Sequence, residues 1–455
     1  MRLLLIEAID YGLKEVTSFP SLGLGCIAAY LKKYLASVEI KIISKNIESN
    51  LTAFKPDLVG ISSVSQNFNA AKEAARLCKA KGLFVIMGGF HISSLPNNLD
   101  QSMDLGVIGE GEQTMLEILK LGQDFGFNHD RIRQLTGVAF RESNSQVVVN
   151  PPRELIEPLD KVPFPDRELL GLRSRNVMIS SRGCPYRCAF CSSTRMWPKV
   201  RWFSAEYVVA EIKELFEKYD AHYIELWDDL VVANRQRLKK IIELLEKERL
   251  LGKIEFCFAV RANLVDEEIA RLLKKMNVAM VTMGLESMSP EILNYLKDNV
   301  TVRQNRQAVE ILNQAGIKVG GNFVLGSPRE KAEDILHSLR FARKAKLKAI
   351  SAYLLTPLPG TPVWQYAQKR GLVSEQMDWS KLRIAFSGNL DNSIIVSQGL
   401  SRQQLTGFLK KFAWIKKKKK ITFRINRLFQ IIKVALSEPQ RIIPMLKIKL
   451  KTIQE

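Results

Sequence analysis

Three cysteines within eight residues are the first candidates for chemistry in this chain of 455 residues. Cys184, Cys188 and Cys191 stand at the spacing C-x3-C-x2-C. Cysteine thiolates are the usual ligands of iron–sulfur clusters, and a [4Fe–4S] cluster held by three of them keeps one iron open. The spacing therefore predicts a cluster whose open iron can bind a substrate directly, here the amino and carboxylate groups of S-adenosylmethionine (SAM). One electron from the cluster could then cleave the carbon–sulfur bond of SAM.

Structural zinc is the main alternative, and a chance grouping of cysteines is the other. Zinc takes four closed ligands, but no fourth cysteine or histidine lies near the motif, and the next histidine is His222. Cys26, Cys78 and Cys257 lie singly in apolar stretches, which is typical of small core residues. They do not form the pairs of a disulfide-rich secreted chain. The cysteines therefore favour a reducing, cytoplasmic setting and a metal cluster.

The segment that must position the cysteines is predicted to be a partial barrel. Six strand-like stretches begin at residues 177, 223, 254, 278, 317 and 349. Helical patterns follow them at 204–219, 234–250, 265–276, 303–315, 331–346 and 362–371. Six such units predict a (β/α)6 relative of the TIM barrel that is open on one side, with its chemistry at the carboxyl ends of the strands. The cysteines follow the first strand, at that end.

The N-terminal third predicts a separate α/β domain. Residues 1–125 alternate strand-like and helix-like stretches, which predicts a doubly wound parallel sheet, and 126–150 form a small strand-rich ending. The opening MRLLLIE is expected to be a buried strand and not a signal peptide. No apolar run is long enough to predict a membrane-spanning helix.

A proline-rich connector separates the two predicted domains. Five prolines fall between residues 151 and 165, and proline disfavours regular structure. The expected division is an α/β domain over 1–150, a linker over 151–172, a barrel over 173–375 and a basic helical extension over 376–455.

The cysteine loop, with the aromatic Phe190 before its third cysteine, resembles the radical SAM superfamily. Further stretches are similar to the subgroup with an N-terminal cobalamin (B12)-binding domain of the flavodoxin or Rossmann type. They are KPDLVGIS (55–62), MGGFH (87–91), GEGEQT (109–114), PFPD (163–166), LWDD (226–229), GLES (284–287) and PLPGTP (357–362). The resemblance covers roughly residues 1–375 and implies three cofactors: a [4Fe–4S] cluster, SAM and cobalamin.

Polar residues at the predicted strand ends are candidates for binding SAM. Asp228 and Asp229 could meet its amino group, or form an ordinary solvent-facing loop. Arg261 could pair with its carboxylate by a two-pronged hydrogen bond, or form a salt bridge at the barrel mouth. Glu286 and Ser287 are candidates for the ribose hydroxyls.

Two aromatic residues of the cysteine loop complete the set of SAM candidates. Tyr186 and Phe190 lie between the cysteines. Phe190 could pack against adenine, although filling space around the cluster is an equally good interpretation.

Small and hydroxyl residues follow the strands of the N-terminal domain, where ligands of open α/β sheets bind. By resemblance the ligand is cobalamin, and the alternative is a sheet that has kept only its fold. The candidates are Ser62, Ser63, Gly88, Gly89, Gly109, Glu110 and Gly111. The cobalt-ligating motif Asp-x-His-x-x-Gly of many cobalamin domains is absent. His91 could line the pocket, and a packed core histidine is the favoured interpretation.

The C-terminus carries much of the charge. The formal net charge is +21, and from Lys410 onward there are 14 Lys and Arg against two acidic residues. Ile421, Ile425, Leu428, Phe429 and Ile432 recur at helical spacing, which predicts a basic amphipathic helix, and a second basic piece covers 442–450. The pattern favours peripheral contact with the inner face of a membrane. Packing on the barrel is the next alternative, and nucleic acid is disfavoured because aromatics for base stacking are sparse.

The leading functional hypothesis is cobalamin-dependent methylation of an unactivated carbon in a small molecule, lipid or tetrapyrrole, with electrons from a flavodoxin or ferredoxin. Radical cyclisation, oxidation or carbon–carbon coupling without methyl transfer is the alternative. Methylthiolation of tRNA or protein is disfavoured, because that class by resemblance carries three further N-terminal cysteines and this chain has two there. A cluster-based sensor without catalysis is the non-enzymatic alternative, and the complete barrel argues against it.

Overall fold

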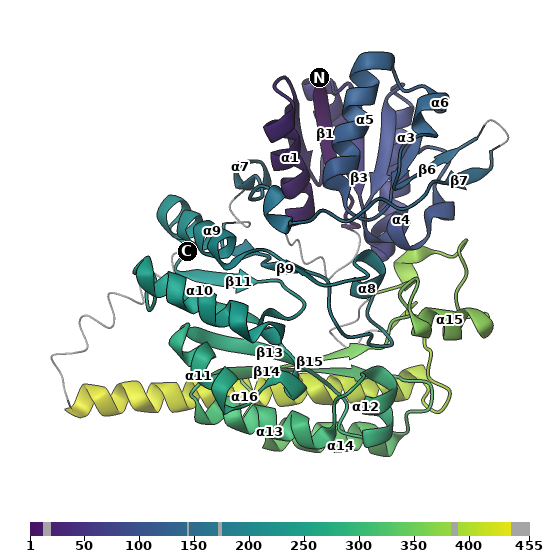
Figure 1. Cartoon of the computed structure of the whole chain (residues 1–455). Helices are drawn as coiled ribbons and strands as arrows, with labels where there is room; N and C mark the ends of the chain where they lie inside the picture. Colours follow the sequence, from purple (N-terminus) through teal and green to yellow (C-terminus); the bar gives the residue numbers. More distant parts are fainter. Residues whose placement is uncertain (12–19, 143–144, 172–174, 384–389, 438–455) are drawn as a thin grey trace.

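A computed structural model describes residues 1–11, 20–142, 145–171, 175–383 and 390–437 (Figure 1). It contains two α/β units, each built on one sheet, with a two-stranded ribbon and a long C-terminal helix. Within the described part of the chain no helix is both long and apolar enough to span a membrane.

The first sheet has the order β2-β1-β3-β4-β5-β6-β7, and its first five strands run parallel. The last two strands are antiparallel, so the sheet ends in a small antiparallel extension. The strands are β1 (Arg2–Glu7), β2 (Glu39–Ile43), β3 (Leu58–Ser62), β4 (Phe84–Gly88), β5 (Leu105–Val107), β6 (Val138–Arg141) and β7 (Val147–Val149).

Helices cover both faces of this sheet, as the alternation in the sequence predicts. One face packs against α1 (Leu22–Tyr34) and α5 (Gly111–Phe125). The other packs against α2 (Ile47–Phe54), α3 (Phe68–Lys79) and α4 (Phe90–Ser94). In β1, Leu3 and Leu5 point to the first face while Leu4 and Ile6 point to the second, because successive side chains of a strand alternate.

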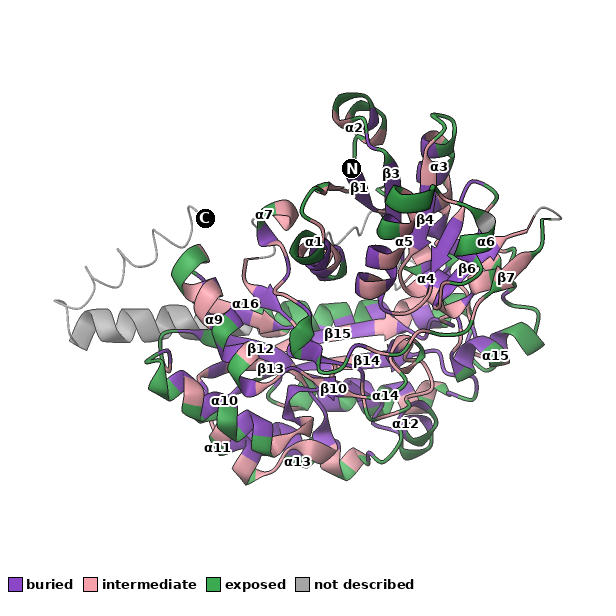
Figure 2. Cartoon of the chain, turned by 45° about the horizontal axis from the view of Figure 1, so that its top comes forward, coloured by how far each residue is buried: buried purple, intermediate pink, exposed green. Residues whose placement is uncertain are grey.

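The second sheet forms the partial barrel. Its six strands are all parallel, and its two edge strands, β8 and β15, do not pair with each other. In spatial order they are β8 (Val177–Met178), β11 (Tyr223–Leu226), β12 (Glu255–Val260), β13 (Val278–Glu286), β14 (Lys318–Leu325) and β15 (Ala349–Leu354). The strands are largely buried, and the helices that cover them expose one side (Figure 2).

Each predicted barrel helix exists, and short helices that were not predicted occur between them. The helices are α9 (Ala205–Tyr219), α10 (Arg235–Lys247), α11 (Glu267–Lys275), α13 (Val302–Gln314), α14 (Ala332–Lys344) and α15 (Pro362–Lys369). The additional α12 (Pro290–Leu296) spans seven residues, too few for a clear helical period. Val363 and Trp364 of α15 pack in the same cluster as α3 and α4, so the two units share part of a core.

The proline-rich segment is packed against the barrel. Ile156, Leu159 and Val162 are buried in the barrel core, and α7 (Arg167–Leu170) follows them. Arg167 donates to Glu211 of α9 at 2.7 Å, with both side chains buried. The domain boundaries at residues 150, 172 and 375 remain predictions. The proline-rich segment is held on the barrel by its buried apolar side chains.

The C-terminal helix α16 (Arg402–Ser437) is longer than the predicted helix and begins about 20 residues earlier. Leu405, Phe408, Leu409, Phe412 and Ile415 are buried against the barrel. The five lysines at 416–420 continue the same helix. The second basic piece at 442–450 lies outside the described residues.

Candidate functional site

The cysteines lie on a loop that leaves the first barrel strand. β8 is followed by β9 (Ser181–Arg182), which pairs with β10 (Arg201–Trp202), and the cysteine loop connects these two short strands. Gly183 has a φ of +92°, and a Cβ there would lie 2.7 Å from the carbonyl oxygen of Lys199. Glycine therefore permits the close approach that starts the loop.

The three thiols are free, partly exposed and close to one another. The backbone N–H of Cys191 donates to the carbonyl of Cys188 at 3.1 Å. Burial raises the pKa of the Cys191 thiol to about 12, and the neighbouring Cys188 and Cys184 contribute to that rise. Deprotonation for ligation must therefore be driven by the metal itself.

A single metal ion does not fit the described residues. Among the described residues, no group of three or more His, Cys, Asp or Glu side chains is arranged as the ligand set of a metal ion. Tetrahedral zinc needs four ligands close to one point, whereas a cluster distributes its thiolates over several irons. The donor set of three neighbouring thiols therefore fits a cluster better than structural zinc.

Arg261, directly after β12, holds the cysteine loop from inside the barrel. It donates from Nη1 to the sulfur of Cys188 at 3.2 Å and from Nε to Asn263 at 3.0 Å. Its guanidinium lies 3.8 Å from the ring centre of Tyr186, whose hydroxyl accepts from Asn263 at 2.9 Å. Arg261 and Tyr186 therefore fix the cysteine loop against the end of β12.

The two aspartates after β11 have different environments. Asp228 is buried and accepts from the backbone N–H and the hydroxyl of Ser180 at 2.6 and 2.8 Å, and also from Ser181. Asp229 accepts from the hydroxyl of Ser193, the first residue of α8 (Ser193–Met196). Burial raises the pKa of the Cys184 thiol, and the charge of Asp229 adds to that rise. Asp228 thus ties the start of β9, just before the cysteine loop, to the end of β11, while Asp229 lies near the cysteines.

Glu286 and Ser287 end β13 in a strained, buried turn. Glu286 has a φ of +51°, and its carboxylate lies 3.4 Å from Nζ of Lys297. Burial raises the pKa of Glu286, and the charge of Lys297 opposes that rise. The hydroxyl of Ser287 is fully buried and accepts from the backbone N–H of Ser289 at 3.2 Å. A non-glycine residue at positive φ commonly marks a functional turn.

Phe190 lies where the cysteine loop meets the shared core. Its side chain is partly buried against the cluster that contains Val363 and Trp364. The neighbouring Ala189 pairs with both flanking helices, donating to Leu296 and accepting from Val363. This packing favours the space-filling role of Phe190 over contact with adenine.

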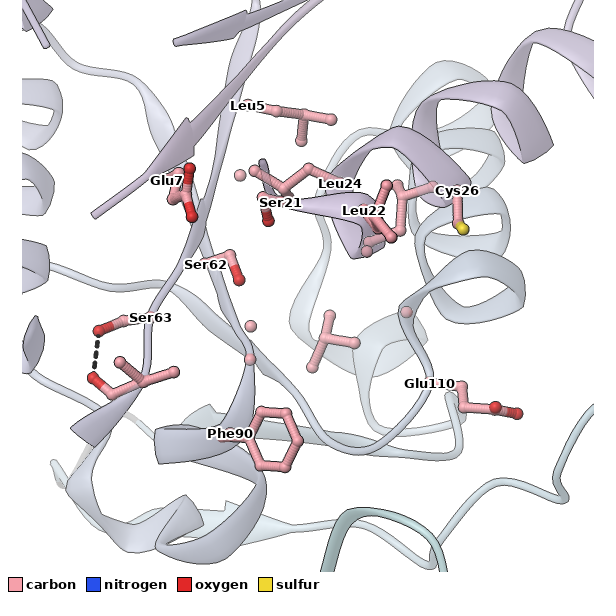
Figure 3. A pocket seen from close by; sticks show the side chains of 18 of the residues that line it. Leu5, Glu7, Ser21, Leu22, Leu24, Cys26, Ser62, Ser63, Phe90 and Glu110 are labelled. Atoms are coloured by element: carbon pink, nitrogen blue, oxygen red, sulfur yellow. Dashed lines mark hydrogen bonds between the residues drawn. The ribbon is translucent and has the colours of Figure 1, made fainter. Parts of the chain in front are cut away.

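A cavity of about 400 Å³ opens at the carboxyl edge of the first sheet, on the face covered by α1 and α5 (Figure 3). The strand order reverses between β1 and β3, the position at which ligands bind in sheets of this order. All seven cobalamin candidates line this cavity, namely Ser62, Ser63, Gly88, Gly89, Gly109, Glu110 and Gly111.

Residues from the barrel close the cavity from the opposite side. None of these five was predicted from the sequence to bind a ligand, although Trp227 belongs to the LWDD stretch: Ile179, Arg182, Met196, Trp197 and Trp227. Arg182 immediately precedes the Gly183 turn of the cysteine loop. The cavity therefore lies between the sheet edge and the loop that carries the thiols.

Glu110 links the two α/β units through ion pairs. Its negative charge is compensated within the protein and is therefore not available to a ligand. Its carboxylate accepts from Arg182 at 2.6 Å and from Arg201 at 2.8 Å, and Arg182 also donates to Glu112 at 2.5 Å. Burial opposes ionisation of Glu110, but hydrogen bonds and charge from Arg201 and Arg182 outweigh it and lower its pKa to about 2. The sequence alone did not reveal this ion cluster.

Gly89 and His91 shape the sheet edge in different ways. Gly89 has a φ of +95°, and a Cβ there would lie 2.6 Å from the carbonyl oxygen of Ser63. His91 is fully buried, stacks on Phe68 with ring centres 3.7 Å apart and contacts the hydroxyl of Ser65 at 3.1 Å. It does not line the cavity, in agreement with a packed histidine.

Two family models match the chain. The model of the radical SAM superfamily matches residues 178–342, and that of the B12 binding domain matches residues 12–119. The first match contains the cysteine loop and most of the barrel. The second contains the sheet edge that forms the cavity.

Relatives and solved structures extend this match over most of the chain. The uncharacterised methyltransferase PH0819 of Pyrococcus horikoshii is 30% identical over 403 residues, covering 83% of this chain and 85% of the relative. The anaerobic magnesium-protoporphyrin IX monomethyl ester cyclase of Rubrivivax gelatinosus is 26% identical, covering 78% and 67%. The radical SAM methyltransferase TsrM of Kitasatospora setae, solved with cobalamin and a [4Fe–4S] cluster, has a TM-score of 0.68 at 18% identity and covers 90% and 81%. The chain therefore belongs to the radical SAM superfamily, in the group with an N-terminal B12-binding domain, and is an enzyme whose cofactors are a [4Fe–4S] cluster, SAM and cobalamin.

Proposed function

We propose that this enzyme transfers a methyl group from cobalamin to an unactivated carbon of a small-molecule, lipid or tetrapyrrole substrate. The observation that carries the proposal is the position of Arg182, which lines the cavity and lies two residues before Cys184. The cavity and the cysteine loop therefore meet at one short segment. Transfer between two bound reactants requires such proximity.

Cys184, Cys188 and Cys191 are the residues that would hold the cluster. When bound, the cluster supplies the electron that cleaves SAM, and cobalamin supplies the methyl group. Arg261 holds the sulfur of Cys188 in place and adds positive charge beside the thiolates. The electron donor would be a flavodoxin- or ferredoxin-type protein.

The residues around the cysteines would orient SAM. Asp229 lies near the thiols and is the better candidate for its amino group, because the oxygens of Asp228 already accept three hydrogen bonds. Glu286 forms an ion pair with Lys297 at the barrel mouth. Its carboxylate would accept hydrogen bonds from the ribose hydroxyls of SAM. Ser287 then stabilises the turn and does not contact SAM, because its hydroxyl group is fully buried within the turn.

Radical cyclisation or oxidation without methyl transfer is the second candidate. One observation favours keeping it: the relative from Rubrivivax gelatinosus is named a cyclase. The mass of the product separates the candidates, since methylation replaces one hydrogen by a methyl group and cyclisation removes hydrogen.

The proposal is tested by anaerobic purification with added cobalamin, iron and sulfide. We expect a [4Fe–4S] cluster and bound cobalt, reductive SAM cleavage, and loss of cleavage in Cys184→Ala, Cys188→Ala and Cys191→Ala. Cys257→Ala is the matched control, because this buried thiol lies on β12 and is not part of the C-x3-C-x2-C motif. SAM cleavage that persists without the three cysteines would disprove the assignment.

We also propose that the α14–α16 surface contacts an anionic membrane. A groove between these helices combines cations with two exposed apolar side chains, Leu336 at 40% and Trp414 at 49% exposure. Its basic residues are Arg340, Arg343, Lys410 and Lys411. Apolar side chains amid cations suit the headgroup region, and each basic residue contributes about 1 kcal/mol near an anionic surface.

Vesicle sedimentation tests this surface. We expect binding to vesicles of phosphatidylcholine with phosphatidylglycerol but not to phosphatidylcholine alone, and loss of binding in a variant carrying Lys410→Glu and Lys411→Glu. The control carries Lys239→Glu and Lys240→Glu on α10, an equal charge change at exposed positions. Equal binding by both variants, or preference for RNA over vesicles, would contradict the proposal.

A further inference from the structure

Glu7 ends β1 at the point where the strand order of the first sheet reverses. β1 pairs with β2 on one side and with β3 on the other, and Glu7 lies opposite Ser62 in the β1–β3 register. A crevice at such a reversal is the usual ligand site of an open α/β sheet. Figure 3 shows the side chain of Glu7 on the same wall of the cavity as Ser62.

The alternation of β1 determines which way Glu7 points. Leu3 and Leu5 pack toward α1 and α5, and Glu7 follows them at steps of two residues. Leu5 and Gly60 of the neighbouring strand line the same cavity. Glu7 therefore borders this cavity, and because it ends the strand it also borders a second hollow that is lined by residues of α2 and α3.

The carboxyl of Glu7 has no hydrogen bond or ion pair with any other residue of the described ranges. Burial raises its pKa to about 7. A partly buried carboxyl group without a partner is costly, and this one borders the space that the cofactor would fill. The carboxyl group of Glu7 interacts neither with the cysteine loop nor with the ion cluster around Glu110.

We infer that Glu7 is a cobalamin-binding residue whose carboxyl group, holding its proton, donates a hydrogen bond to an amide carbonyl of the corrin periphery. The inference rests on the proposed cobalamin-dependent function and deepens it. A neutral carboxyl group adds no charge to the filled cavity, whereas an ionised one must lose its water when the cofactor covers it. Cobalamin binding should therefore take up a proton near neutral pH and weaken as the pH rises.

Other groups near Glu7 must be separated from it in the test. The titratable and charged residues that line the two cavities bordering Glu7 are Tyr11, Lys45, Glu48, Glu73, Cys26, Glu110, Glu112 and Arg182. Glu110 and Glu112 are held by arginines, and burial raises the pKa of Cys26 to about 12. Glu48 is exposed and lies outside the first cavity, which makes it the matched control.

The experiment measures cyanocobalamin binding to the full-length protein from about pH 6 to about pH 9. Cyanocobalamin carries no titrating axial water, so its own chemistry does not change over this range. For the wild-type protein the dissociation constant should rise toward tenfold per pH unit above the pKa of Glu7. Calorimetry in buffers of different ionisation enthalpy should show proton uptake on binding.

Three variants decide the assignment. Glu7→Gln should bind with no pH dependence and no proton uptake, Glu7→Asp should retain both, and Glu48→Gln should match the wild type. Iron content after reconstitution checks that each variant is folded. If Glu7→Gln does not fold, the wild type and Glu7→Asp are compared. Proton uptake by both on cyanocobalamin binding supports the role of Glu7, and its absence contradicts that role.

The possible failures are distinguishable. Cyanocobalamin binding that is independent of pH, or that depends on pH equally in Glu7→Gln, would overturn the role of Glu7 and leave the cobalamin function standing. No binding by the wild type at any pH would overturn both, while the cysteine cluster would still be tested by its iron content.

Discussion

Arg182 donates from Nη1 to Oε1 of Glu110 at 2.6 Å, and this buried ion pair joins the cysteine loop to the edge of the first sheet. Arg201 shares the same carboxylate, and Glu112 accepts the other arm of Arg182. The pair therefore fixes the cavity wall and the start of the cysteine loop relative to each other. Several expected outcomes follow from this arrangement and from its surroundings.

Glu110→Gln should lower the free energy of unfolding by about 3–5 kcal/mol, because it removes the charge that compensates the buried Arg201 and one of the two carboxylates that compensate Arg182. Denaturation in urea, followed by circular dichroism, measures the change. Glu248→Gln is the control: Glu248 pairs with Lys213 at the exposed surface and its loss should have no measurable effect. Similar midpoints for both variants would show that the buried cluster contributes little.

Arg261→Lys should weaken retention of the cluster, because lysine cannot donate at once to Cys188, Asn263 and the carbonyl of Asp298. Loss of a residue that supports a metal ligand typically costs about 10- to 100-fold in affinity. Iron retained after gel filtration measures this. Arg235→Lys, in an exposed ion pair with Asp266, is the control. Full iron content in Arg261→Lys would contradict the role.

Gly89→Ala should destabilise the protein and weaken cobalamin binding. The new Cβ would lie 2.6 Å from a backbone oxygen of Ser63, in a conformation that only glycine adopts readily. Gly82→Ala is matched, since Gly82 also has a positive φ but open space around its Cβ. Gly82→Ala should lower the free energy of unfolding only by its conformational strain, about 1–2 kcal/mol. Equal thermal midpoints and equal cobalamin affinity for both variants would refute the close approach.

His91 should make the stability depend on pH. Burial, with a smaller contribution from Lys72, lowers its pKa to about 3, so the folded protein keeps it neutral. The unfolded chain protonates this residue below its ordinary value of about 6.5. Stability from this residue is therefore complete above about pH 6.5 and falls as the pH approaches 3, by up to about 1.4 kcal/mol per pH unit.

His91→Gln removes this titration and tests its sign. The free energy of unfolding of the wild type, measured relative to His91→Gln, should decrease between about pH 6.5 and about pH 4. A constant difference over that range would mean that His91 is protonated in the folded state as readily as in the unfolded one.

Most of the fold could be predicted from the sequence because the spacing of apolar residues shows which side of each helix or strand is buried. The six barrel strands and their helices follow the alternation of apolar residues, and Leu3 to Ile6 mark a strand buried on both faces. The short α12 and the β9–β10 ribbon escaped prediction, since seven and two residues carry too little pattern. The early start of α16 was missed because its buried residues depend on the barrel surface beneath them.

The candidate site could be predicted only in part. The cysteines and the seven cavity residues follow from spacing and from strand ends. The roles of Asp228 and Glu110 could not be foreseen, because their partners Ser180 and Arg201 are distant in sequence and meet them only in the folded chain. Glu7 belongs to no recognised motif, and its place at the cavity becomes visible only from the strand order and the cavity lining of the folded chain.

One spectrum tests the central claim most directly. Protein reconstituted anaerobically and then reduced should give the electron paramagnetic resonance signal of a [4Fe–4S]⁺ cluster, and SAM should change that signal because it binds the open iron. The variant lacking the thiols of Cys184, Cys188 and Cys191 should give no such signal. A signal that is unaffected by SAM, or one that survives removal of these three thiols, would contradict the account.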